Sequence, residues 1–153
     1  MNQQALQDLV DWQCYGCGRN NEMGLRIKSY WFGDELVCDW HPKPFHAGHP
    51  GNLHQGVTAT ICFCHGAWAA TAMAHRNEGR EIQNPVQFFY INRSLHFDAL
   101  RAIPIDSTVT FRASVLTLDR ASATVSTGAF VGDEKYAQAE THLIRKTADE
   151  MEF

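Results

Sequence analysis

Val57 to Ala74 form a run of eighteen residues without Asp, Glu, Lys or Arg, and no other segment constrains the fold so strongly. The run contains three threonines, a histidine and a glycine, which are poor choices for an isolated membrane span. A helix that is apolar on every side is buried inside a protein, because something must cover each of its faces. The sequence therefore predicts a core helix over roughly residues 57–76 and no membrane partner.

Short β-forming segments lie on both sides of this run. Residues 25–32 and 35–41 precede it, and Gly33-Asp34 between them is a good tight turn for a hairpin. Gly132-Asp133 marks a second hairpin turn near the end of the chain. Four β segments follow the run, at 86–97, 107–118, 121–131 and 136–146.

This order of elements predicts an α+β domain in which a curved antiparallel sheet wraps around one long helix. A sheet of this kind has open edges, and open edges favour pairing with a second copy of the chain. We therefore expect self-association, as a homodimer or a homotetramer.

Length and composition restrict the class of protein. The 153 residues fit one domain, with residues 1–24 expected to form a short amphipathic helix and a turn-rich region. The net charge of −4 argues against the broad basic surface that nucleic acid selects. Residues 1–13 lack the basic start and apolar core of a secretory signal, and five cysteines are an odd number for a disulfide framework. We expect a cytoplasmic protein with free thiols.

Three blocks of sequence occur in an informative order: CYGCGRNNEMGLRIKSY at 14–30, HPGNLHQGVTATI at 49–61 and LHFDALRAIPIDSTVTFRASV at 95–115. Together they resemble the hotdog-fold acyl-CoA thioesterase superfamily, especially its phenylacetate-pathway-like and 4-hydroxybenzoyl-CoA thioesterase-like members. The resemblance implies a hotdog fold and an acyl-CoA or other acyl thioester as ligand. It implies no cofactor beyond the coenzyme A that is part of the substrate.

His54-Gln55-Gly56 matches the His-Gly-Gly motif of these proteins, with Gln55 in place of the first glycine. Backbone N–H groups at a helix N-terminus can stabilise the oxyanion that forms when a thioester is attacked. We expect the amides of Gly56 and Val57 to hold the thioester carbonyl. Asn52 and Gln55 are expected to bind substrate at the mouth of this site.

The resemblance places a catalytic Asp or Glu nine residues after the motif histidine, where this chain has Phe63. A phenyl ring can act neither as a base nor as a nucleophile, and the loss of a general base costs on the order of 10² to 10⁴ in rate. Phe63 is expected to line the acyl pocket. Two functions stay open: a thioester hydrolase with another catalytic group, or a noncatalytic acyl-thioester binding or regulatory domain.

Cys64 is one candidate replacement, because a thiolate activated by a nearby base is a competent nucleophile. His65 points about 100° away on the helix, so His49 or His54 has to supply the base. The alternative is that Cys64 only packs in the core. His49 also lies in a GHPG segment similar to the catalytic segment of hotdog β-hydroxyacyl dehydratases, which makes lyase activity a third hypothesis.

Two groups of residues were weighed as metal ligands. His46, His49 and His54 lie in a proline-broken loop, and Cys14 and Cys17 lack a second cysteine pair at zinc spacing. We therefore predict no metal site and a packed turn at the two cysteines.

Two arginines that follow the long helix are candidates for binding the phosphates of coenzyme A. A guanidinium group binds phosphate through two parallel hydrogen bonds. Arg93 and Arg101 are accordingly expected to contact substrate.

Overall fold

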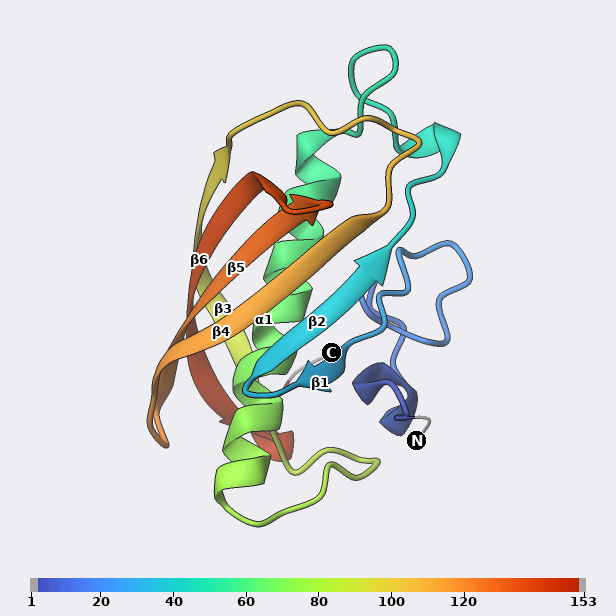
Figure 1. The fold of residues 1–153 in the computed structure, drawn as a ribbon. Coiled ribbons are helices and arrows are strands. Elements are labelled where there is room, and N and C mark those ends of the chain that lie inside the picture. The colour runs from blue at the N-terminus through green and yellow to red at the C-terminus, as the bar shows by residue number, and fades with distance from the viewer. Residues whose placement is uncertain (1–2, 152–153) are drawn as a thin grey trace.

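The structure, a computed structural model, describes residues 3–151. One long helix, α1 (Gln55–Asn77), lies against the concave face of a six-stranded sheet that wraps around it, as Figure 1 shows. The strands run in the order β1-β2-β4-β5-β6-β3, and every neighbouring pair is antiparallel. They are β1 (Tyr30–Phe32), β2 (Glu35–Trp40), β3 (Phe88–Ala99), β4 (Val109–Leu118), β5 (Ser122–Val131) and β6 (Glu134–Thr147). The predicted α+β architecture is confirmed.

Both predicted hairpin turns are present. Gly33 has φ +63° between β1 and β2, and Gly132 has φ +59° between β5 and β6. Glycine adopts these left-handed conformations without steric cost, which is why each turn closes in two residues.

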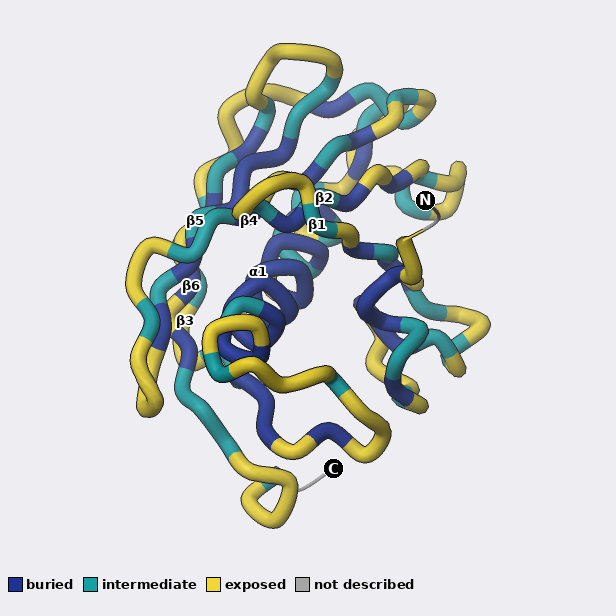
Figure 2. The backbone as a smooth tube through the Cα atoms, turned by 60° about the horizontal axis from the view of Figure 1, so that its bottom comes forward, coloured by how far each residue is buried: buried dark blue, intermediate teal, exposed yellow. Residues whose placement is uncertain are grey.

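Burial accounts for the apolar run that follows Gly56. By length and composition α1 could cross a membrane, but 72% of its most apolar window is buried inside the structure. Figure 2 shows α1 as a dark blue core with the sheet curved around it. The helix is two residues longer at its start than predicted and ends one residue later.

The sheet approaches the helix closely at Gly66. A Cβ atom on Gly66 would lie 2.9 Å from Thr141 Oγ1 of β6 and 3.6 Å from Thr127 Oγ1 of β5. Small residues flank it on the helix, with Ala67, Ala69 and Ala70 all buried. The sheet therefore packs almost directly on the helix backbone.

The N-terminal region differs from its prediction. The expected amphipathic helix over residues 5–13 is one short 3₁₀ turn, Leu6–Leu9, after which Val10 is extended. Leu6 N–H donates to Ser29 O (3.1 Å), and Leu6 and Val10 are both buried. Contacts with the rest of the protein therefore override the local helical pattern.

The first predicted strand is also shorter than expected, since β1 starts at Tyr30 and not at residue 25. Arg26 has φ +51°, which breaks the extended conformation. Leu25 N–H donates to Tyr15 O (2.7 Å), and Ile27 N–H donates to Gly16 O (3.2 Å). The segment thus binds the cysteine-containing turn, residues 14–17, and not a neighbouring strand.

His65 joins this N-terminal region to the core. Its ring is fully buried, with Nδ1 2.8 Å from Ser29 Oγ and Nε2 2.8 Å from Leu36 O. Gln7 completes the network by donating from Nε2 to Ser29 Oγ (2.8 Å). Because Leu36 O can only accept, Nε2 carries the hydrogen and the ring is neutral. Burial lowers the pKa of His65 to about 4.

We expect His65 to make the protein less stable in mild acid. The unfolded chain takes up a proton on this histidine near pH 6.5, whereas the folded chain does so only near pH 4. The contribution of neutral His65 to the free energy of unfolding is therefore complete above pH 6.5. It is lost as the pH falls towards 4, by about 3 kcal/mol in total. Urea unfolding measured between pH 7.5 and 4.5 checks this.

His65→Gln is the matched control, because its amide can donate to Leu36 O and accept from Ser29 without titrating. The variant is expected to lose this part of the pH dependence. Parallel pH profiles for the variant and the wild type would show that His65 does not contribute.

Candidate functional site

His54 caps the N-terminus of α1. Its Nδ1 accepts a hydrogen bond from Gly56 N–H (2.9 Å), and its backbone O accepts from Val57 N–H (3.0 Å). A Cβ atom on Gly56 would lie 2.8 Å from the His54 ring, so the glycine lets the ring fold over the helix end. The cap satisfies N–H groups that every helix start leaves free.

A cleft of about 520 Å³ lies at this end of the helix. The structure brings four predicted site residues together on its wall: His49, Asn52, His54 and Gln55. The loop that carries them is fixed by Leu53 N–H, which donates to Ile103 O (2.8 Å). The cleft is therefore a preformed feature at the start of α1, with polar side chains set in a largely apolar wall.

The sequence prediction took the amides of Gly56 and Val57 to be available for a ligand, and the structure differs here. Both N–H groups donate to His54. The Val57 bond is part of the regular start of the helix, whereas the Gly56 bond depends on the orientation of one side chain. A ligand oxygen can take the Gly56 N–H only after the His54 ring turns away.

Gln55 connects this cleft to Arg101. Its Nε2 donates to Arg101 O (3.1 Å), and its Oε1 is buried without a hydrogen-bond partner among the described residues. The Arg101 guanidinium is exposed and pairs with Glu134 (2.5 Å). Arg93 is exposed on β3 at a register irregularity, far along the strand from the cleft residues. Arg101 therefore lies near the start of α1, whereas Arg93 follows Asn92, which contacts Phe63 in the middle of the helix. Phosphate binding by either arginine stays a prediction.

A second pocket, of about 300 Å³, lies beside Phe63. Its wall is mostly apolar and includes Trp12, Phe63, Ala67, Phe89, Ile91 and Met151. Phe63 is 40% exposed although it lies within the core helix, which shows that its ring faces this opening. An apolar group of modest size fits these surroundings.

Asn92 is a pocket residue that the sequence reasoning missed. It lies on β3, lines the pocket beside Phe63, and donates from Nδ2 to Phe63 O (3.0 Å). Its Oδ1 is buried and has no partner in the part of the chain that the structure describes. The sequence carries no clear signal for it, because Phe88, Phe89 and Tyr90 are all buried and this part of β3 does not alternate.

Cys64 lies in the same pocket, next to cysteines and not next to a histidine. Its Sγ is 3.8 Å from Cys14 Sγ. His65 is committed to Ser29 and Leu36, and Gln55 at the helix start lies about 13 Å from Cys64 along the axis. Within one chain, the predicted pairing of Cys64 with His49 or His54 is therefore not formed.

No family model matches the sequence, and no curated protein does. Solved structures do match. A thioesterase from Haemophilus influenzae superposes with a TM-score of 0.69 at 17% identity, over 84% of each chain. A thioesterase superfamily protein from Shewanella loihica superposes with a TM-score of 0.63 at 23% identity, over 77% of this chain and 89% of its own.

This chain has the hotdog fold of the thioesterase superfamily. A third hotdog structure, from Streptococcus mutans and bound to acetyl CoA, superposes with a TM-score of 0.65 at 10% identity, over 79% of this chain and 89% of its own. At these identities the likeness establishes the hotdog fold.

The Gly56 amide and the side chain of Phe63 lie at different heights along the central helix. Gly56 and Phe63 are seven residues apart, which places them on nearly the same face of α1. The same spacing puts them about 10 Å apart along the axis. One thioester group therefore cannot contact the Gly56 amide and the position of Phe63 in the same chain.

We expect His54→Ala to lower the free energy of unfolding by about 1 kcal/mol, because the Gly56 N–H loses its side-chain acceptor. His54→Asn is expected to recover most of the loss, since asparagine is a favoured N-cap. Urea unfolding at pH 7.5 measures both variants. Equal stability of the alanine variant and the wild type would contradict the capping role.

Proposed function

We propose that this chain binds acyl thioesters, with acyl-CoA as the ligand class. The observation that carries the proposal is the apolar pocket beside Phe63 on the central helix of a hotdog fold. Similar folds include the Streptococcus mutans protein bound to acetyl CoA and a hypothetical thioesterase from Streptococcus pneumoniae with coenzyme A. In this chain the acyl group occupies the pocket.

The polar part of the ligand meets unsatisfied groups of the protein. Gln55 Oε1 and Asn92 Oδ1 are buried acceptors without donors among residues 3–151. A buried polar atom without a partner costs free energy that a ligand donor can recover. The pantetheine arm of coenzyme A carries amide N–H groups of the required kind. Arg93, which makes no ion pair within the described residues, is exposed and is the candidate for the phosphates.

The proposed site is shared between two copies of the chain. Gly56 and Phe63 are about 10 Å apart along one helix, so one thioester group cannot contact both in the same chain. We therefore place the thioester at Gly56 of one copy and its acyl group in the pocket beside Phe63 of the other copy. β3 (Phe88–Ala99) is the last strand of the sheet and pairs only with β6 within the described part of the chain. Its free edge is where we place the second copy.

Thioester hydrolysis is the second candidate function. It is favoured by the solved thioesterases of this fold and by the position of Cys64 and Cys14 in the acyl pocket. Phe63, at the position where the resemblance implies a carboxylate, supplies no base. Binding with little or no turnover is therefore the form of the function that the residues support best.

We expect Phe63→Asp to gain acyl-CoA hydrolysis, on the order of 10² to 10⁴ above the wild type, because it restores a base beside the bound thioester. Free coenzyme A is to be quantified by chromatography over a series of acyl chain lengths. Thiol reagents are unsuitable, since Cys14 is exposed and reacts with them.

Phe63→Asn is the matched control, because it has nearly the same size as aspartate but cannot act as a base. It is expected to bind without turnover. Absence of acyl-CoA binding by the wild type, measured by calorimetry at every chain length, would remove the proposed function. Efficient turnover by the wild type would instead favour the hydrolase.

A further inference from the structure

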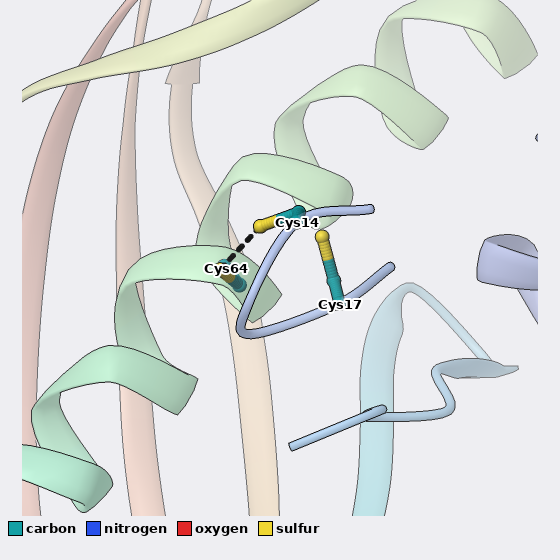
Figure 3. A group of neighbouring side chains, drawn as sticks. All are labelled: Cys14, Cys17 and Cys64. Carbon is teal, nitrogen blue, oxygen red and sulfur yellow. Dashed lines mark hydrogen bonds between the residues drawn. The ribbon is translucent and has the colours of Figure 1, made fainter. Parts of the chain in front are cut away.

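Three cysteines from distant parts of the sequence converge beside the pocket. Cys14 and Cys17 belong to the turn of residues 14–17, and Cys64 lies on α1. Their Sγ atoms all lie within 4.8 Å of one another, and Figure 3 shows Cys14 and Cys17 on one turn beside Cys64 of the helix. All three are free thiols. The sequence reasoning found the pair Cys14 and Cys17 but could not supply the third member.

The spacing of the sulfur atoms matches that of a metal-thiolate site. Thiolate sulfur binds Zn²⁺ at about 2.3 Å, which places neighbouring sulfurs of a tetrahedral site about 3.8 Å apart. Cys14 Sγ and Cys64 Sγ are 3.8 Å apart. A disulfide would require the two sulfurs to approach to about 2.05 Å. The observed separation is that of a hydrogen bond between the two thiols, and it also lets both sulfurs bind one ion without a large movement.

The turn of residues 14–17 is arranged to stabilise negative charge on sulfur. Hydrogen bonds from the thiols of Cys17 and Cys64, and from the backbone N–H groups of Cys17 and Gly16, hold the pKa of Cys14 far below its usual range. Gly18 N–H donates to Cys14 O (2.8 Å) and closes the turn. The turn therefore directs backbone N–H groups, as well as the neighbouring thiols, towards Cys14 Sγ.

Gly16 allows Cys64 to reach this turn. A Cβ atom on Gly16 would lie 2.4 Å from Cys64 Sγ and 3.2 Å from its Cβ. Any other residue at position 16 would push the helix and the turn apart. The close contact between the two elements is therefore built into the sequence at one position.

A buried donor next to the cysteines has no partner. Trp68 is fully buried on α1, and its indole N–H makes no hydrogen bond within the described residues. It is nevertheless near enough to Cys17 to act on that thiol, whose pKa the neighbouring Cys14 raises to about 12. A metal-bound Cys17 thiolate supplies the acceptor that this N–H lacks, as outer partners of metal ligands commonly do.

The described residues that line the pocket beside the cysteines carry no cationic side chain and include no Lys, Arg or His. No side chain of the described pocket wall can balance the negative charge of thiolates at this place. A bound cation provides the balance, and the pocket leaves room for a further ligand on it.

We propose that Cys14, Cys17 and Cys64 bind one thiophilic divalent cation of the Zn²⁺ class through three thiolates, with the remaining coordination position open to the pocket. Starting from three thiols, binding forms three metal–sulfur bonds and releases three protons to solvent. No electron is transferred. The site is independent of the proposed function, because its formation needs no thioester.

Titration of the reduced, metal-free full-length chain with Co²⁺ tests the site. We expect a thiolate-to-Co²⁺ charge-transfer band in the near ultraviolet that saturates at one ion per chain and disappears when Zn²⁺ displaces the cobalt. Cys17→Ala and Cys64→Ala are expected to lose the band. Cys62→Ala is the matched control, because Cys62 is a buried free thiol on the same helix outside the cluster.

The wild-type titration decides the outcome even if a variant fails to fold, which circular dichroism would reveal. Absence of a charge-transfer band in the reduced wild type, together with no Zn²⁺ retained on equilibrium dialysis, would overturn the proposal. A band that survives in the folded Cys17→Ala and Cys64→Ala variants would also overturn it. Neither result depends on whether the chain binds acyl-CoA.

Discussion

The close packing of the sheet on α1 at Gly66 is the constraint on which the rest of the structure depends. Without a side chain at that position, Thr141 and Thr127 reach the helix backbone, and the sheet can curve around the helix. That curvature covers most of an apolar helix whose other side is covered by the N-terminal region. Protein interiors are packed as densely as organic crystals, so this contact fixes the helix relative to every strand.

The position of the helix in turn determines what its two exposed parts can do. Its first turn opens on a cleft that carries His49, Asn52 and His54, and Phe63, two turns later, opens on an apolar pocket. Hydrogen bonds from Gln7 to Ser29 and between Ser29 and His65 attach the N-terminal region to the same helix. The apolar pocket is formed by four parts of the chain, namely α1, β3, the segment from Trp12 to Cys17, and Met151.

The sequence predicted the architecture because its main features are local. A long uncharged run predicts a buried helix, and glycine with aspartate between β-forming segments predicts tight turns. The prediction was wrong for residues 5–13 and 25–29, where buried contacts with Ser29 and with the cysteine-containing turn override local preference. It placed His49, Asn52 and His54 correctly in the loop before the helix, and the structure joins them in one cleft with Gln55, the first residue of α1.

The cysteine cluster and Asn92 could not be predicted in this way. They depend on contacts between residues far apart in the chain, and no local pattern in one sequence indicates such contacts. Cys64 lies fifty residues from Cys14, and their contact requires the folded turn and the glycine at position 16. Asn92 is one polar residue in a mainly apolar strand start, and its unpaired oxygen is visible only once the surrounding side chains are in place.

The bond between His54 and Gly56 has a consequence for selectivity. Any incoming oxygen has to compete with an imidazole nitrogen that is already in position and tethered to the same helix. Water and a neutral ester carbonyl are weak competitors, whereas an oxygen that carries negative charge forms a much stronger bond to an N–H group. The Gly56 N–H therefore binds an oxygen that carries negative charge in preference to a neutral acceptor. Such an arrangement stabilises the charge that develops on an oxygen during a reaction more than it stabilises a neutral bound ligand.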